Sequence, residues 1–403
     1  MGMTERTRSA ARAVRRVCCA LMKSLGARAH GLRKERMAAS PRFDGEVFRN
    51  VHRVGPGLKK GTALPTMRDF LFGGQRRVPR APLPLVSPLE PWTRAPESAF
   101  RATWLGHSTV LVELDGGRVL TDPVWGERVS PVSFAGPKRF HAAPVSIAQL
   151  PPLDAVIISH DHYDHLDHPS ILELARGTVP FITSLGVGAH LEAWGVPPER
   201  IFELDWWEHL DLACGLRVTA APSQHFSGRS VADRNATAWS SFHVRGDKHS
   251  FFFSGDTGLT DEYAEIRARL GAIDLVMLEV GAFHPAWGDI HLGPENALAA
   301  FDLLTSGNAR SALLPVHWGT FNLAIHAWDD PPETLVKLAP AHDVQLVMPR
   351  IGEPTEPARH AAVDPWWRSV AEAEERGAKR APHEEVAPSD DANDADEVML
   401  PID

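Results

Sequence analysis

The sequence has few cysteines and no long apolar run. Its three cysteines are Cys18, Cys19 and Cys214 in a chain of 403 residues. Adjacent cysteines seldom pair with each other, so no disulfide framework is expected, and this usage favours a reducing compartment, the cytoplasm. No hydrophobic stretch reaches the roughly 20 residues that a membrane-spanning helix needs. The sequence also lacks repeats and a coiled-coil pattern. A disulfide-stapled, membrane-spanning or solenoid protein is therefore not expected.

An excess of positive charge is also missing. Lys and Arg number 42 against 51 Asp and Glu, a formal net charge of −9. This balance argues against a general nucleic-acid-binding protein and leaves a small molecule or a lipid as the expected partner. Basic residues do gather in residues 1–39, which we interpret as a flexible N-terminal segment. The alternative is an amphipathic helix that contacts the inner membrane surface through anionic lipid. The sequence does not indicate an oligomeric state.

Composition divides the rest of the chain into three parts. Residues 40–98 are rich in Pro, Gly and Arg with little periodicity, which predicts an arm that wraps the main body. Residues 99–380 form the expected globular domain. Residues 381–403 are acidic and lack aromatic residues, so a disordered tail is expected.

Short apolar runs and helical patterns alternate through the globular domain. Strands are expected at 102–105, 109–114, 118–121, 155–158, 180–183, 216–222, 239–244, 250–254, 273–280 and 312–316. Helices are expected at 169–175, 187–194, 262–270 and 293–301. This alternation predicts a mixed α/β (α+β) architecture.

The most informative stretch is residues 159–167, which read SHDHYDHLD directly after an apolar run. Imidazole nitrogens and carboxylate oxygens suit Zn²⁺ and its first-row neighbours. His160 and His162 project from the same side of an extended chain, whereas Asp164 and His165 follow where the chain can turn. A loop that is merely rich in histidine is the alternative, but the H-x-H-x-D-H pattern favours a metal site.

A recurring placement strengthens this interpretation. Expected strands end just before several metal-competent side chains, namely His160, His162, His225, Asp256 and His317. A single histidine of this kind is more often structural. Strand ends that meet at one sheet edge form a rigid rim, so together these residues predict one site.

Several segments resemble the metallo-β-lactamase fold hydrolases, and more narrowly the subfamily of the N-acyl-phosphatidylethanolamine-hydrolysing phospholipase D. The resemblance spans roughly residues 43–348. It lies in the segments SHDHYDH (159–165), GDTG (255–258), VHWG (316–319), WLGHST (104–109), LTDP (120–123), GPKRF (136–140), HWGTF (317–321) and FRN (48–50).

The resemblance implies a four-layer αβ/βα sandwich and a site with two zinc ions, although other first-row divalent metals also suit these ligands. Carried over by position, His160, His162 and His225 hold one ion. Asp164, His165 and His317 hold the other, and Asp256 bridges both. A hydroxide between the ions is the implied nucleophile.

Further site residues are predicted around this cluster. Asp122 is expected to orient a ligating imidazole, with a turn role before Pro123 as the alternative. His291 resembles a family position near the metals and joins Asp256 and Asp164 as a catalytic candidate; a histidine at a helix entry is the alternative. His107 either lines the site or is simply buried. Substrate contacts are expected from a further set that could also belong to the core or face solvent: Trp206, Trp207, Trp318, Lys138 and Arg139.

Three functions follow as hypotheses. The first is a dinuclear zinc phosphodiesterase of phospholipase D type, acting on N-acyl-phosphatidylethanolamine-like lipids or related phosphodiesters. The second is a lactonase or other carboxylic-ester hydrolase, because the same site polarises a carbonyl group. The third is a non-catalytic metal-binding scaffold, which is disfavoured because no ligand of the motif is missing.

Overall fold

Apolar and β-branched runs form two seven-stranded sheets in the computed structural model, which describes residues 21–380 apart from 53, 55, 56, 307, 309 and 361. In the first sheet the order is β14-β1-β2-β3-β4-β5-β6. Its strands are β1 (Phe100–Gly106), β2 (Thr109–Leu114), β3 (Gly117–Thr121), β4 (Ala155–Ile158), β5 (Phe181–Ser184), β6 (Ile201–Leu204) and β14 (Pro354–Thr355). Strands β3 to β6 run parallel, whereas β14, β1, β2 and β3 pair antiparallel.

The second sheet mirrors this arrangement, with the order β13-β12-β11-β10-β9-β8-β7. Its strands are β7 (His209–Asp211), β8 (Arg217–Ala221), β9 (Ser241–Arg245), β10 (Ser250–Phe253), β11 (Leu275–Glu279), β12 (Ala312–Val316) and β13 (Gln345–Leu346). Strands β10 to β13 are parallel, so their carboxyl ends meet at the same sheet edge.

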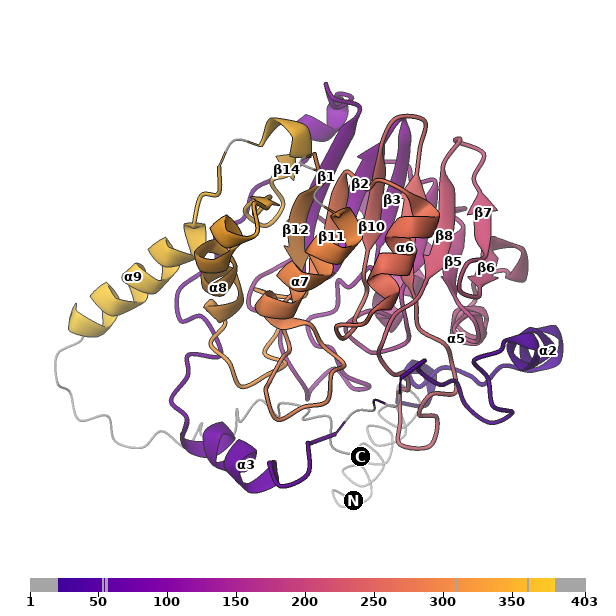
Figure 1. Cartoon of the computed structure of the whole chain (residues 1–403), viewed down its shortest axis with the longest axis horizontal. Coiled ribbons are helices and arrows are strands. Elements are labelled where there is room, and N and C mark those ends of the chain that lie inside the picture. Colours follow the sequence, from indigo (N-terminus) through magenta and orange to yellow (C-terminus); the bar gives the residue numbers. More distant parts are fainter. Residues whose placement is uncertain are drawn as a thin grey trace, which may run out of the picture.

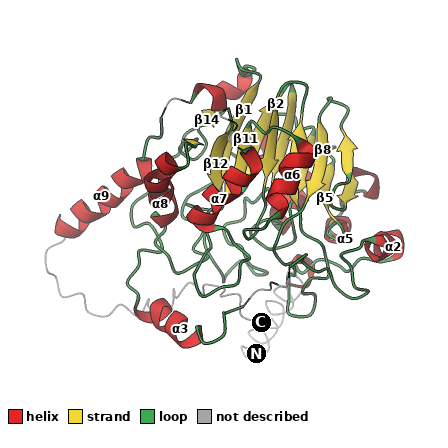
Figure 2. Cartoon of the chain, in the orientation of Figure 1, coloured by secondary structure: helices red, strands yellow, loops and turns green. Residues whose placement is uncertain are grey.

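Helices cover the outer faces of both sheets (Figures 1 and 2). They are α4 (His168–Leu174), α5 (Gly188–Ala193), α6 (Glu262–Leu270), α7 (Gly293–Thr305) and α8 (Asp330–Leu338). Three further helices lie beside the sandwich rather than over a sheet, namely α2 (Gly31–Ala39), α3 (Ala63–Phe72) and α9 (Trp366–Arg380). Single 3₁₀ turns lie at Pro91–Thr93, Ile147–Gln149, Pro198–Arg200, Ala339–Ala341 and Pro357–Arg359. Among the described helices, none is both long and apolar enough to cross a membrane.

Strand β4 shows how the layers are built. Val156 and Ile158 pack with residues of α4 and α5, whereas Ala155 and Ile157 join the larger core that includes the second sheet. Successive side chains of a strand point to opposite faces, and both faces of β4 are covered. This explains the uninterrupted apolar run that the sequence shows there. The predicted four-layer αβ/βα sandwich is confirmed.

The segment before the sandwich lies against it. Within the predicted arm, Leu58 forms a β-bridge with Trp287, and Leu85 forms one with Ile351. Part of the N-terminal segment, residues 21–39, also packs on the body. Met37 of α2 is buried, and Arg33 pairs with the buried Glu203 at 2.7 Å. Residues 1–20 and the acidic tail at 381–403 lie outside the described residues.

Phe48 is the arm residue with the most buried side chain, at 0% exposure, in a cluster with Met37, Leu185 and Trp239. We expect Phe48→Ala to lower the free energy of unfolding by about 3–5 kcal/mol, because it removes a buried ring and leaves a cavity. Urea denaturation measures this change. Val51→Ala is the matched control, since its side chain is 61% exposed, and its effect should stay within about 0.5 kcal/mol. An equally small effect at Phe48 would contradict the packing of the arm.

Candidate metal centre

Four chain segments deliver the predicted metal ligands to one edge of the two sheets. The loop after β4 carries His160, His162, Asp164 and His165. His225 follows β8, Asp256 follows β10 and His317 directly follows β12. The structure therefore brings together all seven residues that the sequence singled out.

Metal-competent atoms of the described residues form two groups of four and a smaller group of Asp256, His291 and His317, and within each group the atoms lie within 4.8 Å of one another. One group contains His160, His162, His225 and Asp256. In it, His162 Nδ1 lies 2.8 Å from His160 Nε2 and 3.3 Å from His225 Nε2. The other group of four contains His107, Asp164, His165 and His317. Asp164 Oδ2 lies 3.1 Å from His107 Nε2 and 3.2 Å from His317 Nε2. Each group has the donor set of a transition-metal site.

Asp256 lies between the two groups and turns one oxygen to each. Its Oδ1 atom is 3.1 Å from His165 Nε2 and 3.2 Å from His317 Nε2. Its Oδ2 atom is 3.7 Å from His225 Nε2 and 3.9 Å from His160 Nε2. A carboxylate placed in this way can be shared by two cations.

Hydrogen bonds on the far side of the rings fix which nitrogen faces the cluster. His165 donates from Nδ1 to Asp122 Oδ2 at 2.6 Å, and His225 donates from Nδ1 to the carbonyl of Ile290 at 2.9 Å. Ser159 Oγ lies 2.9 Å from His160 Nδ1 and donates to Asp122 Oδ2 at 2.6 Å. Each of the three rings thereby presents Nε2 to the cluster, as a metal ligand requires.

The backbone at the cluster is unusual. His107, Asp122 and His317 adopt positive φ angles of 52°, 31° and 65°. Such conformations are costly for residues other than glycine and persist where surrounding contacts hold them. Gly255 also has a positive φ, of 55°, and a Cβ atom there would lie 2.6 Å from Ser159 Cβ. The glycine lets the segment before Asp256 approach the loop that carries His160.

The pKa values of the cluster histidines shift in two opposite directions. Burial lowers the pKa values of His160, His162 and His225, which keeps these rings neutral. Burial also opposes protonation of His317, but the charge of Asp256 and the hydrogen bond to Asp164 raise its pKa to about 10. In His165 the neighbouring carboxylates likewise outweigh burial, and its pKa rises well above the usual value. The neighbouring carboxylates therefore stabilise the protonated forms of His165 and His317.

A second observation, independent of the ligand types, indicates that the cluster suits metal ions. His165 Nε2 and Asp256 Oδ1 are both buried and lie 3.1 Å apart, yet neither has a hydrogen-bond partner. Buried polar groups without partners are costly. Cations bound between them would satisfy both atoms.

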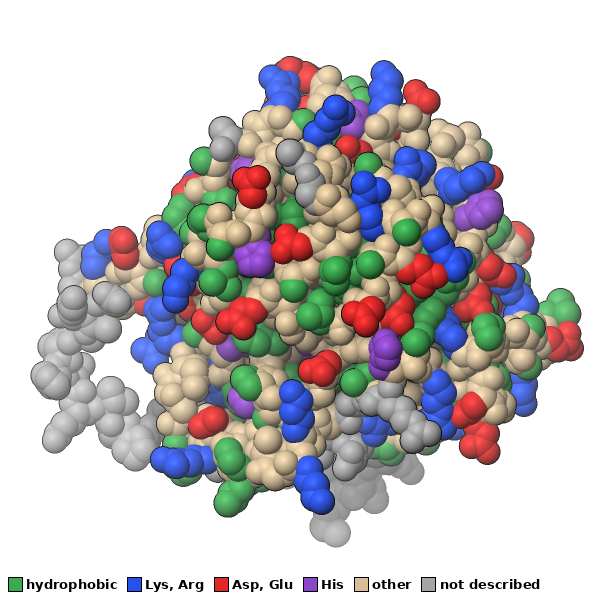
Figure 3. Space-filling model, in the orientation of Figure 1, with side chains coloured by type: hydrophobic (Ala, Val, Ile, Leu, Met, Phe, Trp, Pro, Cys, Tyr) green, Lys and Arg blue, Asp and Glu red, His purple; other side chains and the backbone are tan. Residues whose placement is uncertain are grey.

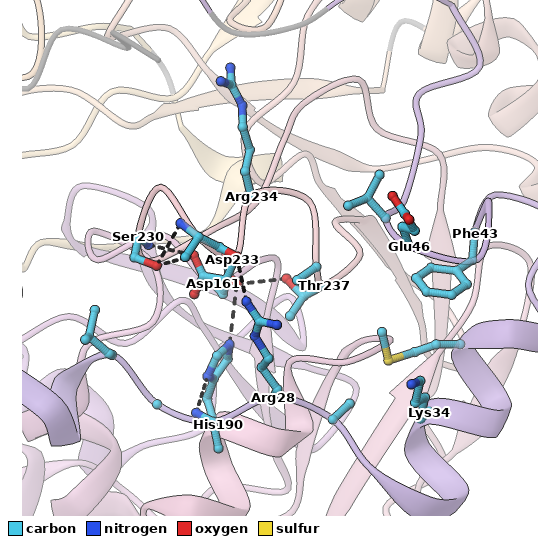
Figure 4. Close-up of a pocket in the computed structure, with 18 of the residues that line it drawn as sticks. Arg28, Lys34, Phe43, Glu46, Asp161, His190, Ser230, Asp233, Arg234 and Thr237 are labelled. Carbon is cyan, nitrogen blue, oxygen red and sulfur yellow. Dashed lines mark hydrogen bonds and ion pairs between the residues drawn. The ribbon is translucent and has the colours of Figure 1, made fainter.

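Asp161, between two of the ligands in sequence, points the other way (Figure 4). It borders a cavity of about 570 Å³ that lies against residues 25–47 and the loop at 230–237. Its carboxylate accepts hydrogen bonds from Gly228 N at 2.7 Å and Thr237 Oγ1 at 2.8 Å, and lies 3.4 Å from His190 Nε2. Asp161 therefore ties the loop of His160 to the segment that follows His225.

The predicted substrate contacts do not gather around the cluster. Trp318 is 4% exposed and stacks between Trp104 and Trp366, so it belongs to the core rather than to an open wall. Arg42 of the arm covers Trp206 at 3.8 Å, and Arg269 of α6 covers Trp207 at 4.2 Å.

The two basic candidates have protein partners. Lys138 pairs with Glu127 at 3.1 Å on the surface. Arg139 is half-buried, donates to the carbonyl of Val124 at 2.8 Å and packs against the Phe321 ring. Arg139 thus holds the loop around it together.

Two residues near the cluster escaped the sequence analysis as site residues. Asn50 of the arm brackets the backbone of His225, donating from Nδ2 to its carbonyl at 2.8 Å and accepting from its N–H at 3.1 Å. Glu279, the last residue of β11, is fully buried and lies 3.2 Å from His291 Nδ1. An acid within an otherwise apolar strand was the available signal for Glu279. Asn50 ends the FRN segment (48–50) of the family resemblance, but no local pattern indicates that its side chain would meet His225.

Asp122 offers a direct test of ligand orientation. We expect Asp122→Asn to weaken zinc binding by about 10–100-fold, because the amide no longer supplies the charge that holds the His165 ring. Competition against a chromophoric chelator measures the affinity. Asp154→Asn is the matched control, since Asp154 precedes β4, at the end opposite to the cluster, and accepts from Arg118 N at 2.8 Å. Equal affinities in the two variants would contradict the assigned role.

The fold and the cluster define a metal-dependent hydrolase. Residues 117–318 match the beta-lactamase superfamily domain, and the chain belongs to the metallo-β-lactamase superfamily. A solved isothiocyanate hydrolase from Delia radicum gut bacteria shares the fold. It superposes with a TM-score of 0.51 at 20% identity, over 64% of this chain and 98% of that one.

Two relatives narrow the family. An uncharacterized protein of Mycobacterium tuberculosis is 47% identical over 292 residues, which cover 72% of this chain and 77% of that protein. The N-acyl-phosphatidylethanolamine-hydrolyzing phospholipase D 1 of Caenorhabditis elegans is 36% identical over 236 residues, 56% of this chain and 65% of the relative. This chain is thus a homologue of that phospholipase.

Proposed function

We propose that the protein is a dinuclear zinc phosphodiesterase of phospholipase D type, acting on N-acyl-phosphatidylethanolamine-like lipids or related phosphodiesters. The observation that carries the proposal is the position of Asp256, whose two oxygens face two separate groups of imidazole and carboxylate ligands. The similarity to the nematode phospholipase supports the substrate class.

In this proposal His160 Nε2, His162 Nδ1 and His225 Nε2 hold one cation. Asp164, His165 and His317 hold the second, and Asp256 is shared. Two bound cations would lower the pKa of a shared water and neutralise charge on phosphoryl oxygens. Asp122 and the carbonyl of Ile290 keep the ligand rings in place.

The side from which substrate enters is indicated by residual exposure. Most of the cluster is fully buried, but the side chains of Asp164 and His291 remain 15% and 13% exposed. His291 Nδ1 lies 3.9 Å from Asp256 Oδ2, so its ring borders the ligands. We assign His291 to proton transfer between the attacking water and the leaving oxygen, a role that an imidazole can fill.

A lipid substrate is supported by helix α3. It exposes Leu64 and Phe72, each 80% exposed, and Met67, 55% exposed. The chain just before α3 is bonded to the loop of Trp287, through Lys59 N donating to the carbonyl of Ala286 at 2.7 Å. Exposed apolar side chains of this kind suit contact with a lipid surface. Residues 1–20 of the basic N-terminal segment, the membrane contact suggested by the sequence, lie outside the described residues.

Nucleic acid is not the proposed partner. The formal net charge is −9, and on the face in Figure 3 basic and acidic side chains are interspersed among the described residues. A nucleic-acid-binding surface is instead continuously basic. A metal-binding scaffold is disfavoured because the donor set is complete. Cysteine usage keeps the cytoplasm, at the inner membrane surface, as the proposed location.

The proposal is tested with the zinc-loaded full chain and a substrate panel. The panel contains N-acyl-phosphatidylethanolamine in mixed micelles, phosphatidylcholine, an aryl phosphodiester and a set of lactones. We expect release of N-acylethanolamine, and in ¹⁸O-water we expect the label in the phosphatidic acid, because water attacks phosphorus. Faster hydrolysis of lactones, or label in the alcohol, would contradict the proposal.

A further inference from the structure

Glu279 is a buried acid that the proposed chemistry has not used. It ends β11, its side chain is 0% exposed, and the residues before it in the strand are apolar. Burying a carboxylate is costly unless hydrogen-bond donors surround it. The contacts of Glu279 therefore indicate what it holds.

The position of Glu279 in the sheet places it beside the metal ligands. Strand β11 lies between β10, which leads to Asp256, and β12, which leads to His317. All three strands are parallel and end at the same edge. Glu279 is nonetheless absent from the metal-competent groups formed by the described residues. It occupies the strand-end position of a ligand but is directed elsewhere.

The hydrogen bonds of Glu279 lead to His291. Its Oε1 atom accepts from Leu292 N at 2.8 Å and lies 3.2 Å from His291 Nδ1. Thr257 N donates to the same oxygen at 3.4 Å, whereas Oε2 has no hydrogen-bond partner. A single oxygen thus joins the segment after Asp256 to the residue pair that precedes α7. Because a carboxylate only accepts, the His291 nitrogen that faces it carries the proton.

We propose that Glu279 is a positioning residue that holds the His291 ring beside the cluster with its proton on Nδ1, leaving the Nε2 lone pair free. The tautomer of a histidine is set by the hydrogen bond that its other nitrogen makes. The carboxylate also stabilises the imidazolium that forms when Nε2 takes up a proton.

The consequence for catalysis rests on the proposed phosphodiesterase function. Nε2 takes a proton from the attacking water, the oxygen of that water bonds to phosphorus, and the P–O bond to the leaving alcohol breaks. The same proton then passes from Nε2 to the leaving oxygen, so water and phosphodiester become phosphomonoester and alcohol with no proton left over. With the proton on Nε2 instead, His291 could not begin this transfer.

The first test reads the tautomer and needs no turnover. Long-range ¹H–¹⁵N NMR of zinc-loaded protein labelled at histidine identifies the protonated nitrogen, and His291→Gln assigns the signal. We expect Nδ1–H in the wild type and in Glu279→Gln, where the N–H of Leu292 keeps the amide oxygen facing the ring. Glu279→Leu should lose this tautomer. An Nε2–H tautomer in the wild type, or an unchanged one in Glu279→Leu, would overturn the proposal.

The second test is a double-mutant cycle on kcat. We expect Glu279→Leu to lower kcat by about 10–100-fold with little change in KM. Glu279→Gln should lower kcat by a smaller factor. In a His291→Ala background, Glu279→Leu should cause no further loss, because Glu279 acts through that ring. Independent, multiplying losses would overturn the proposal.

Glu203→Gln is the matched control for both tests. Glu203 is also a buried strand carboxylate, and it accepts from Gly186 N at 2.8 Å and Gly188 N at 2.9 Å, away from His291. Its substitution should leave the His291 tautomer unchanged. If no substrate of the panel is hydrolysed, the phosphodiesterase proposal fails, whereas the tautomer measurement still decides the role of Glu279.

Discussion

Asp256→Ala is expected to lower kcat/KM for the best phosphodiester by at least about 10³-fold. The substitution removes the carboxylate that faces both ligand groups, and with it the means of holding two cations together. The variant loses several kcal/mol of electrostatic stabilisation of the transition state. Each loss of about 1.4 kcal/mol lowers the rate about tenfold. Initial rates with the zinc-loaded variant measure the loss.

The fold should survive this change. Asp256 joins the sheet through its backbone carbonyl, which accepts from Ser223 Oγ at 2.8 Å and is retained in the variant. The matched control is Asp261→Ala on the same segment, where an exposed side chain caps no helix. Far-UV circular dichroism should be unchanged in both variants. An Asp256→Ala protein with full activity would remove this residue from the mechanism.

Removal of metal should abolish activity and lower the melting temperature, and added Zn²⁺ should restore both. Ions that bind only the folded chain stabilise it by about 4 kcal/mol at a free concentration 1,000-fold above Kd. The hydrophobic clusters of the sheets and helices contain none of the ligands, so the chelated protein should remain folded. Activity that persists after complete chelation would contradict the account.

Zinc binding should also release protons. Without metal, the pKa of His317 is raised to about 10 by Asp256 and Asp164 despite burial, so this ring is charged at pH 7. A ligand must be deprotonated, so apparent zinc affinity should rise by about tenfold per pH unit, below pH 10, for each proton displaced. Calorimetry in buffers of different ionisation enthalpy measures the release. Identical heats in those buffers would contradict it.

Much of the fold can be predicted from local sequence pattern, because each central strand is recognisable from its own residues. The runs at 155–158 and 312–316 are apolar throughout, as strands covered on both faces must be. The short edge strands β7, β13 and β14 were not predicted, since they consist of two or three residues ordered by pairing with a neighbour. Their sequences show no period that could be recognised.

Some residues of the site could likewise be predicted from local pattern, and others could not. His160, His162 and Asp256 could be found because each follows a recognisable strand, and parallel strands place such residues at one edge. Asn50 could not, because it reaches His225 only after the arm has folded over the body. The sequence predicts Trp318 either as a substrate contact or as part of the core. Its stacking on Trp104 and Trp366 depends on side-chain directions that spacing alone does not encode.

The most direct measurement of the central claim is the metal content of the purified full chain after equilibration with zinc, by mass spectrometry of the metal against protein concentration. The arrangement around Asp256 predicts two equivalents per chain, and a loss of metal in Asp256→Ala but not in Asp261→Ala. One equivalent or none in the wild type would contradict a site in which seven side chains hold two cations.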